Sequence, residues 1–311
     1  MSDSVLSQDE HSHESIPRSV LRLIRPQQWV KNVLVFVPLL LAHQTGDTTK
    51  VKDTLLAFVA FNLVASLGYI VNDLKDAGAD RLHPRKRFRP LASGRLSVGA
   101  AVVTAVVLAA TVAGLCFLLP RSVSEWLGAY LATTFAYSLY FKKKLIADML
   151  VLAGLYTLRL LVGSAAARVD LSHWLLGLSM FLFLSLAVLK RYSELQLQRD
   201  AMEASNKSSS LAGRAYGLQD LNILRVIGPT SGYVAVMVMA LYVSSEKVLA
   251  LYPSPHWLWL ICPVLLYWIT RMWLLAERGA IPDDPVAFAA RDRVSYICVL
   301  LMLCIGIIAS R

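Results

Sequence analysis

The stretch Asn72-Asp73-Leu74-Lys75-Asp76-Ala77-Gly78-Ala79-Asp80 follows directly on an apolar run, residues 55–71, that is long enough to cross most of a bilayer. Read as a helix, the stretch places Asn72, Asp76 and Asp80 four residues apart, with Asp73 three residues before Asp76. Side chains at these spacings lie on one face of a helix. The sequence therefore predicts four oxygen-bearing side chains on one face at the end of a membrane-spanning helix.

These clustered carboxylates repel one another unless they share a cation or a basic ligand. Mg²⁺ prefers hard oxygen ligands and is usually bound by one or two carboxylates together with substrate phosphates. Seven Lys or Arg residues follow between positions 75 and 95, where they could neutralise the remaining phosphate charge. The pattern predicts a magnesium polyphosphate site, in which Asn72, Asp73, Asp76 and Asp80 are both metal ligands and catalytic residues. A polar helix end, with basic residues that only set membrane topology, is the plainer alternative.

The composition of the whole chain is that of a membrane protein. Of its 311 residues 56% are hydrophobic and only 17% are charged, whereas a soluble chain carries about a quarter charged residues. The formal net charge of +10 comes from basic residues in the gaps between apolar runs, so orientation in the membrane explains it better than nucleic-acid binding. The four cysteines lie inside apolar runs without a CxxC pair, which is typical of small core residues.

Apolar segments recur along the chain and predict an all-α fold, a bundle of nine transmembrane helices around a central cavity open to the cytoplasm and laterally to lipid. The nine predicted spans are 29–45, 54–73, 97–119, 122–141, 146–166, 173–189, 226–244, 256–275 and 293–310. Residues 1–17 are polar and predict a disordered cytoplasmic tail, and residues 18–311 form one catalytic domain.

The distribution of basic residues predicts the orientation. The N-terminal side of the membrane holds 24 of the 31 Lys and Arg residues, so the N-terminus is expected in the cytoplasm and the C-terminus outside. The expected location is the cell (inner) membrane, as a multi-pass protein. The two motif loops, at about 72–96 and 190–225, lie on the cytoplasmic side in this topology, which places the active site there.

Three residues outside the first motif are candidates for contact with a phosphorylated substrate. Lys142 adjoins the end of an apolar span, with Tyr137 and Tyr140 behind it. Arg159 lies well inside an apolar helix, a costly position that normally faces a partner or a wet cavity. Asp148 shares its face but lies three turns away, too far for a direct pair. We therefore expect Arg159 to serve a ligand or a neighbouring helix.

The chain resembles the UbiA-type intramembrane prenyltransferase superfamily. Residues 72–80 fit its NDxxDxxxD signature, and RFRPLASG at 87–94 resembles the segment that follows it there. Within the superfamily the chain is most similar to the actinobacterial decaprenyl-phosphate phosphoribosyltransferases, over about residues 18–310. Four segments carry that resemblance: RPQQWVKN at 25–32, HPRKRFRP at 83–90, YSLYFKKK at 137–144 and LKRYSEL at 189–195.

One departure from the wider superfamily indicates the substrates. Aromatic prenyltransferases carry a second aspartate-rich motif after the sixth span, where this chain has Lys190, Arg191 and Glu194. Two cations and one carboxylate make a poor metal site but a good site for a phosphomonoester. We therefore expect the isoprenoid to bind as a monophosphate. The diphosphate at the first motif then belongs to a second substrate, which the resemblance identifies as phosphoribosyl pyrophosphate.

The resemblance implies a Mg²⁺-dependent transfer of 5-phosphoribosyl from phosphoribosyl pyrophosphate to polyprenyl (decaprenyl) phosphate, with inversion at ribose C1 and release of pyrophosphate. Its product serves the synthesis of cell-wall arabinan in arabinogalactan. Lys190, Arg191 and Glu194 are the candidates for the lipid phosphate. The candidates for phosphoribosyl pyrophosphate are Lys31, Lys86, Arg87, Tyr137, Lys142 and Arg159.

Three other functions stay open. A prenyltransferase with a polyprenyl diphosphate donor and an aromatic or haem acceptor predicts a second acidic motif near Lys190. A cation transporter predicts ionisable residues at mid-membrane in several spans, whereas only Arg159 is clearly so placed. A membrane scaffold has no need of an acidic face beside seven cations. The expected partners are the two substrates and membrane lipids, without nucleic acid, and a homo-oligomer is compatible with the sequence.

Overall fold

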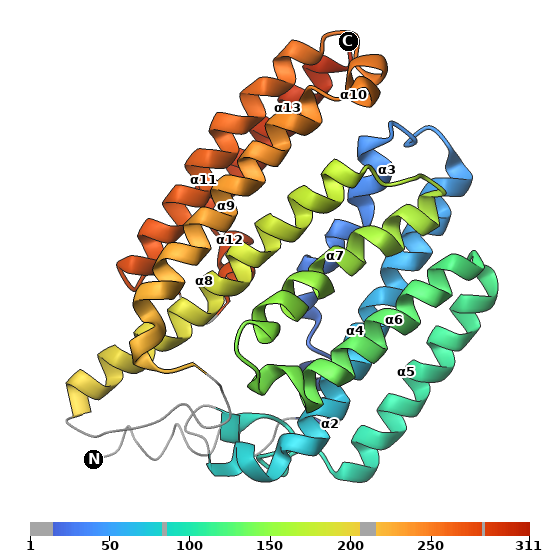
Figure 1. Ribbon diagram of the computed structural model, residues 1–311. Helices are drawn as coiled ribbons and strands as arrows, with labels where there is room; N and C mark the ends of the chain where they lie inside the picture. The colour runs from blue at the N-terminus through green and yellow to red at the C-terminus, as the bar shows by residue number, and fades with distance from the viewer. Residues whose placement is uncertain (1–14, 83–85, 206–215, 282–283) are drawn as a thin grey trace. The chain divides into compact units, whose positions relative to one another are not determined.

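The fold consists of helices joined by short connections. The computed structural model describes residues 15–82, 86–205, 216–281 and 284–311. Within these ranges the chain forms α-helices, short 3₁₀ helices and turns, and no strand (Figure 1). The prediction of an all-α fold is therefore confirmed.

The first described helix begins inside the predicted tail. Helix α2 (Ile16–Ile24) includes the last two residues of the predicted tail, with Pro17 in its first turn, where a missing N–H costs no hydrogen bond. It ends at Arg25, whose φ of 58° lies in the left-handed region. Residues 1–14 of the tail lie outside the described residues.

The chain forms two compact units. The first comprises the described residues up to Phe135 together with Val162–Val169, and the second comprises Ala136–Leu161 and Asp170–Arg311. Helices α6 (Arg121–Leu139) and α7 (Ala147–Ala167) contribute residues to both units.

The first unit is organised along α4 (Thr48–Leu82). At 1.5 Å per residue its 35 residues span about 52 Å, well beyond the roughly 30 Å of a hydrocarbon core. The extra length carries the acidic stretch at its C-terminal end. Other elements of this unit pack on α4: α2, η1 (Pro26–Phe36), α3 (Val37–Leu41), η2 (Lys86–Phe88) and α5 (Val98–Leu118).

The second unit is built on α8 (His173–Ser205) and α9 (Leu221–Val243), which pack along each other. Helix α11 (Ile261–Glu277) packs on both, and α13 (Arg293–Ala309) packs on α11, as the yellow-to-red part of Figure 1 shows. The shorter elements of this unit are η3 (Phe141–Lys143), η4 (Leu218–Asp220), α10 (Glu246–Leu251), η5 (Pro255–Leu260) and α12 (Pro285–Ala289).

Six helices in the described residues are long and apolar enough to cross a membrane: α4, α5, α7, α8, α9 joined to η4, and α11 joined to η5. The other three predicted spans also contain helix, but none of them meets this standard. The first is divided between η1 and α3, α6 begins with the polar residues Arg121, Ser122 and Glu125, and α13 is only 17 residues long. The nine-span count stays a prediction.

The second motif lies on a helix, where the sequence predicted a cytoplasmic loop. The sixth span was expected to end at residue 189, but α8 continues to Ser205, so that Lys190, Arg191 and Glu194 are helical. The extension contains neither Gly nor Pro and is rich in Glu, Gln, Leu and Arg, which favour helix. It also buries Tyr192 and Leu195, and this burial stabilises the added turns. Residues 206–215 of the predicted loop lie outside the described ranges.

Glycine permits one very close contact between elements of the first unit. A Cβ added to Gly163 of α7 would lie 2.0 Å from the carbonyl oxygen of Val35 and 2.8 Å from its carbonyl carbon. Because these are backbone atoms of η1, no side-chain rotation can relieve the clash. Gly163 therefore sets how closely η1 approaches this end of α7.

Substitution Gly163→Ala is expected to lower the free energy of unfolding by roughly 2–4 kcal/mol, because η1 must move to admit the methyl group. Gly154→Ala on the same helix is the matched control, since no atom lies within 4 Å of its added Cβ. The control should be neutral or stabilising by up to about 1 kcal/mol. Thermal unfolding of both variants in detergent tests this, and equal midpoints would contradict it.

Candidate active site

One face of α4 carries a row of buried polar side chains. Asn62, Ser66, Asp73 and Asp80 recur at helical spacing, and each is at most 4% exposed. The predicted helix over residues 72–80 is confirmed, and the two buried aspartates lie two turns apart on one face. Asn72 and Asp76 are partly buried. The face that the sequence predicts at this helix end is thus present.

Hydrogen bonds align η1 with this face. The side-chain amide of Asn32 donates to Asn62 Oδ1 over 2.7 Å, and the indole N–H of Trp29 donates to Ser66 Oγ over 3.1 Å. η1 and this part of α4 therefore run antiparallel, so that earlier residues of η1 lie beside later residues of α4. Further back in this order lies Arg25, at the N-cap of η1.

Arg25 binds Asp73, the first aspartate of the motif. Its Nη2 lies 2.6 Å from Asp73 Oδ1 and 2.7 Å from Oδ2, and its guanidinium lies 5.1 Å from the ring centroid of Tyr69. Arg89 Nη1 lies 3.1 Å from Asp73 Oδ1 and 2.7 Å from Asp80 Oδ2, so one nitrogen bridges both carboxylates. A buried carboxylate needs such partners to stay ionised. The two arginines thus replace the water that burial removes from Asp73 and Asp80.

The donor chemistry of this face fits Mg²⁺, since carboxylate and amide oxygens are its preferred protein ligands. In the described part of the chain, however, no group of three His, Cys, Asp or Glu side chains is already gathered for a metal. Arg25 and Arg89 contact the oxygens of Asp73 instead, so a metal bound there would compete with these arginines for the carboxylate. The predicted site residues include neither arginine, although Arg25 begins the segment RPQQWVKN and Arg89 lies in HPRKRFRP, two segments that carry the family resemblance.

The other predicted cations of the first unit lie on η1 and η2, both of which pack on α4. Lys31 is buried in η1, whereas Lys86 and Arg87 are exposed in η2. The guanidinium of Arg87 lies over the ring of Phe88, 4.8 Å from its centroid. His83–Arg85 of the predicted motif lie outside the described residues.

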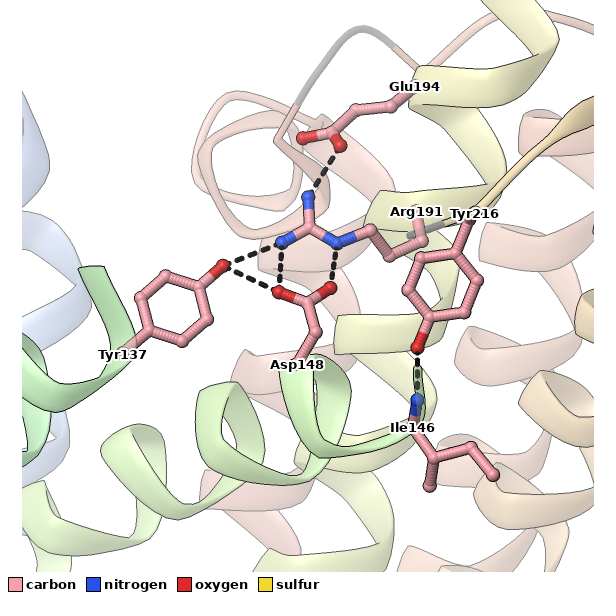
Figure 2. Close-up of polar contacts among 6 residues, drawn as sticks. All are labelled: Tyr137, Ile146, Asp148, Arg191, Glu194 and Tyr216. Carbon is pink, nitrogen blue, oxygen red and sulfur yellow. Dashed lines mark hydrogen bonds and ion pairs between the residues drawn. The ribbon is translucent and has the colours of Figure 1, made fainter. Parts of the chain in front are cut away.

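In the second unit, Arg191 is the centre of a buried polar cluster (Figure 2). Its side chain is 2% exposed and contacts both oxygens of Asp148, Oδ1 at 3.0 Å and Oδ2 more closely. Nη1 donates to Glu194 Oε2 at 2.5 Å, and Nη2 donates to the hydroxyl of Tyr137 at 2.7 Å. That hydroxyl in turn donates to Asp148 Oδ1 over 2.8 Å. The structure therefore brings together Tyr137, Arg191 and Glu194, which the sequence assigned to two different substrates.

Asp148 is the member of this cluster that the sequence analysis did not select. It is fully buried in the first turn of α7, where a negative charge is favourable at a helix N-terminus. An aspartate at the start of a long apolar helix was the signal that could have identified it. The sequence related Asp148 only to Arg159, which instead lies over the ring of Tyr156 at 4.8 Å and donates to the Leu155 carbonyl.

The connection between α6 and α7 carries Lys142 and ends at Ile146. Lys142 is partly buried in η3, and the backbone N–H of Ile146 donates to the hydroxyl oxygen of Tyr216 over 2.6 Å. Burial is the main cause that raises the pKa of Tyr216 above its ordinary value, so the phenol stays protonated at neutral pH. Lys190, next to Arg191, is partly buried on α8.

The chain is similar in sequence to several curated proteins. It is 38% identical to protein y4nM of Sinorhizobium fredii over 88% of this chain, but it spans only 52% of that protein's length. It is also 38% identical to nodulation protein NoeC of Azorhizobium caulinodans, over 89% of this chain and 88% of that protein. It is 31% identical to decaprenyl-phosphate phosphoribosyltransferase of Mycobacterium tuberculosis over 96% of both chains.

The fold is also found among solved structures. A UbiA homolog from Archaeoglobus fulgidus bound to DMAPP and Mg²⁺ superimposes with a TM-score of 0.68 over 92% of this chain and 98% of that one, at 14% sequence identity. This likeness concerns the fold alone. A profile of the UbiA prenyltransferase family matches residues 33–307, nearly the whole described chain. The chain therefore belongs to the UbiA prenyltransferase family.

Proposed function

We propose that this enzyme transfers the 5-phosphoribosyl group from phosphoribosyl pyrophosphate to a polyprenyl phosphate such as decaprenyl phosphate, and releases pyrophosphate. Full-length similarity to a decaprenyl-phosphate phosphoribosyltransferase supports the reaction class. The choice of substrates rests on the ion pairs that the second motif forms. There the carboxylates of Asp148 and Glu194 both bind Arg191 and are not gathered as ligands of a second metal, and Lys190 is the cation that we assign to an anionic substrate.

In the proposed reaction the bond from ribose C1 to the pyrophosphate oxygen breaks, and the leaving group takes the electron pair. A lipid phosphate oxygen attacks C1 from the opposite face and forms the new bond with inversion. No general base is required, because a phosphomonoester is already ionised near neutral pH. Binding and charge stabilisation are then the main contributions of the protein.

The acidic face of α4 is the proposed donor site. Asp73 and Asp76 would hold Mg²⁺, with Asn72 and Asp80 as direct or supporting ligands. When bound, the metal would neutralise charge on the departing pyrophosphate. Arg25 and Arg89, released from Asp73, are then available for phosphate oxygens. We assign five cations to the phosphate charge of the donor that the metal does not neutralise, with Tyr137 in support. They are Lys31, Lys86, Arg87, Lys142 and Arg159.

The basic turn of α8 is the proposed acceptor site. Lys190 is the residue we assign to direct contact with the lipid phosphate. Arg191 and Glu194 support it, because most N–H groups of Arg191 already bind protein oxygens. The cytoplasmic location of both sites and the use of the product for cell-wall arabinan stay predictions.

Purified protein supplied with Mg²⁺, phosphoribosyl pyrophosphate and decaprenyl phosphate is expected to release pyrophosphate, and chelation of the metal should stop the release. A coupled pyrophosphate assay, together with detection of the phosphoribosylated lipid, measures this. A parallel reaction with a polyprenyl diphosphate and an aromatic acid tests the aromatic-acceptor alternative. Turnover only in the parallel reaction would refute the proposal.

Asp73→Asn is expected to reduce kcat by about 10²–10³-fold, because it removes a charge that holds the metal against the leaving group. Asp53→Asn is the matched control, since Asp53 is also buried on α4 and binds an arginine, Arg168 Nη2, at 2.9 Å. Both variants should lose stability, but the control should keep its kcat. Near-normal turnover in Asp73→Asn would count against the metal assignment.

Lys190→Ala is expected to raise KM for the lipid phosphate by about tenfold, the loss of one charge-assisted phosphate contact. KM for phosphoribosyl pyrophosphate should change little. Arg121→Ala removes a cation from an exposed pair with Glu125 and should alter neither constant. An unchanged KM for the lipid phosphate in Lys190→Ala would contradict the acceptor site.

A further inference from the structure

The turn between α6 and α7 has an unusual backbone conformation. Ile146 has a φ of 63°, in the left-handed region that β-branched residues rarely adopt. Its side chain is 60% exposed, so packing of that side chain does not explain the conformation. Such a conformation persists only where surrounding contacts hold it, and these cases concentrate at functional sites.

Two side chains of the second unit hold this turn, Tyr216 at Ile146 itself and Asp148 two residues further on (Figure 2). The hydroxyl oxygen of Tyr216 accepts the Ile146 N–H at 2.6 Å, and Tyr216 itself is buried in the apolar core of the unit. Two residues further on, Asp148 binds Arg191 and Tyr137. The backbone N–H of Asp148 also donates to the carbonyl oxygen of Lys144 over 3.1 Å, which closes the turn.

The segment held in this way is the one with three consecutive lysines. Lys142 and Lys143 lie in η3, and the ammonium of Lys144 lies 5.0 Å from the ring centroid of Tyr140. The ammonium group of a lysine has a well-defined location only when the backbone is fixed, since the four-carbon side chain adds conformational freedom of its own. A rigid turn therefore favours one location for the Lys142 ammonium group.

We infer that Tyr216 and Asp148 are positioning residues for Lys142: they hold the left-handed turn at Ile146 and so fix the backbone that carries this lysine, which the proposed function assigns to the phosphates of phosphoribosyl pyrophosphate. The inference rests on the proposed function, which assigns Lys142 to that substrate. It accounts for a conformation that neither the exposed Ile146 side chain nor the length of the connection requires.

Two substitutions at Ile146 distinguish the effect of a less restricted backbone from the effect of losing the side chain. Ile146→Gly adopts positive φ freely and loosens the turn, whereas Ile146→Ala removes the exposed side chain but keeps the conformational restriction. Ile146→Gly should raise KM for phosphoribosyl pyrophosphate about tenfold, a difference of about 1.4 kcal/mol, with kcat and the unfolding temperature unchanged. Ile146→Ala should keep the wild-type KM.

Tyr216→Phe tests the hydrogen bond itself. It should raise the same KM without lowering kcat, and amide hydrogen exchange at residues 141–146 should become faster. Tyr233→Phe is the matched control, because it removes another hydrogen-bonded tyrosine hydroxyl, whose partner is Thr270 at 3.3 Å. The control should change neither the KM nor the exchange rate at the turn.

The outcomes separate this inference from the proposed function. If the wild-type protein uses phosphoribosyl pyrophosphate but Ile146→Gly and Tyr216→Phe keep its KM, the positioning role is overturned and the function stands. If the wild-type protein does not use that substrate, the proposed function fails. In that case unchanged hydrogen exchange in Tyr216→Phe overturns the inference as well, and faster exchange supports the holding role of Tyr216.

Discussion

A buried charge requires a partner, because its free energy of transfer out of water is prohibitive unless an opposite charge and hydrogen bonds replace the solvent. This constraint organises the polar parts of both units. In the first, the carboxylate of Asp73 is almost completely buried and binds Arg25 and Arg89. In the second, the guanidinium of Arg191 is equally buried and binds Asp148 and Glu194. The two clusters reverse the roles, with an anion at the centre of one and a cation at the centre of the other.

This reversal matches the chemistry that the proposed reaction needs. A central anion that gives up its arginines can accept a metal with a polyphosphate, and the released arginines keep that region attractive to phosphate. A central cation that already holds two carboxylates cannot accept a metal in the same way. Removing Arg191 would leave the fully buried Asp148 without its cationic partner, typically at a cost of about 3–5 kcal/mol. Each cluster thus links local stability to ligand chemistry.

The sequence predicted the elements better than the contacts between them. Residues 72–80 were read as a helix face because spacing and composition are local properties, and α4 confirms that interpretation. The end of α8 was placed too early, because hydropathy falls at Lys190 whereas the helix continues through residues that bury Tyr192 and Leu195. Arg25 and Arg89 were missed since their partner, Asp73, is distant in sequence. Tyr216 was missed for the same reason, 70 positions from the backbone group that it binds.

The 3₁₀ conformation of η1 gives this part of the chain a defined length. A 3₁₀ helix rises about 2.0 Å per residue against 1.5 Å in an α-helix, so its 11 residues reach about 5 Å further. From Asn32 to Trp29 this rise covers about 6 Å, which equals the four-residue step from Asn62 to Ser66 on α4. Inserting one residue between Arg25 and Trp29 would turn the guanidinium by about 120° and separate it from Asp73. Surface loops tolerate changes in length, but the length of this segment is fixed by the spacing of its polar partners on α4. Relatives that keep the same polar pairs should therefore keep its residue count.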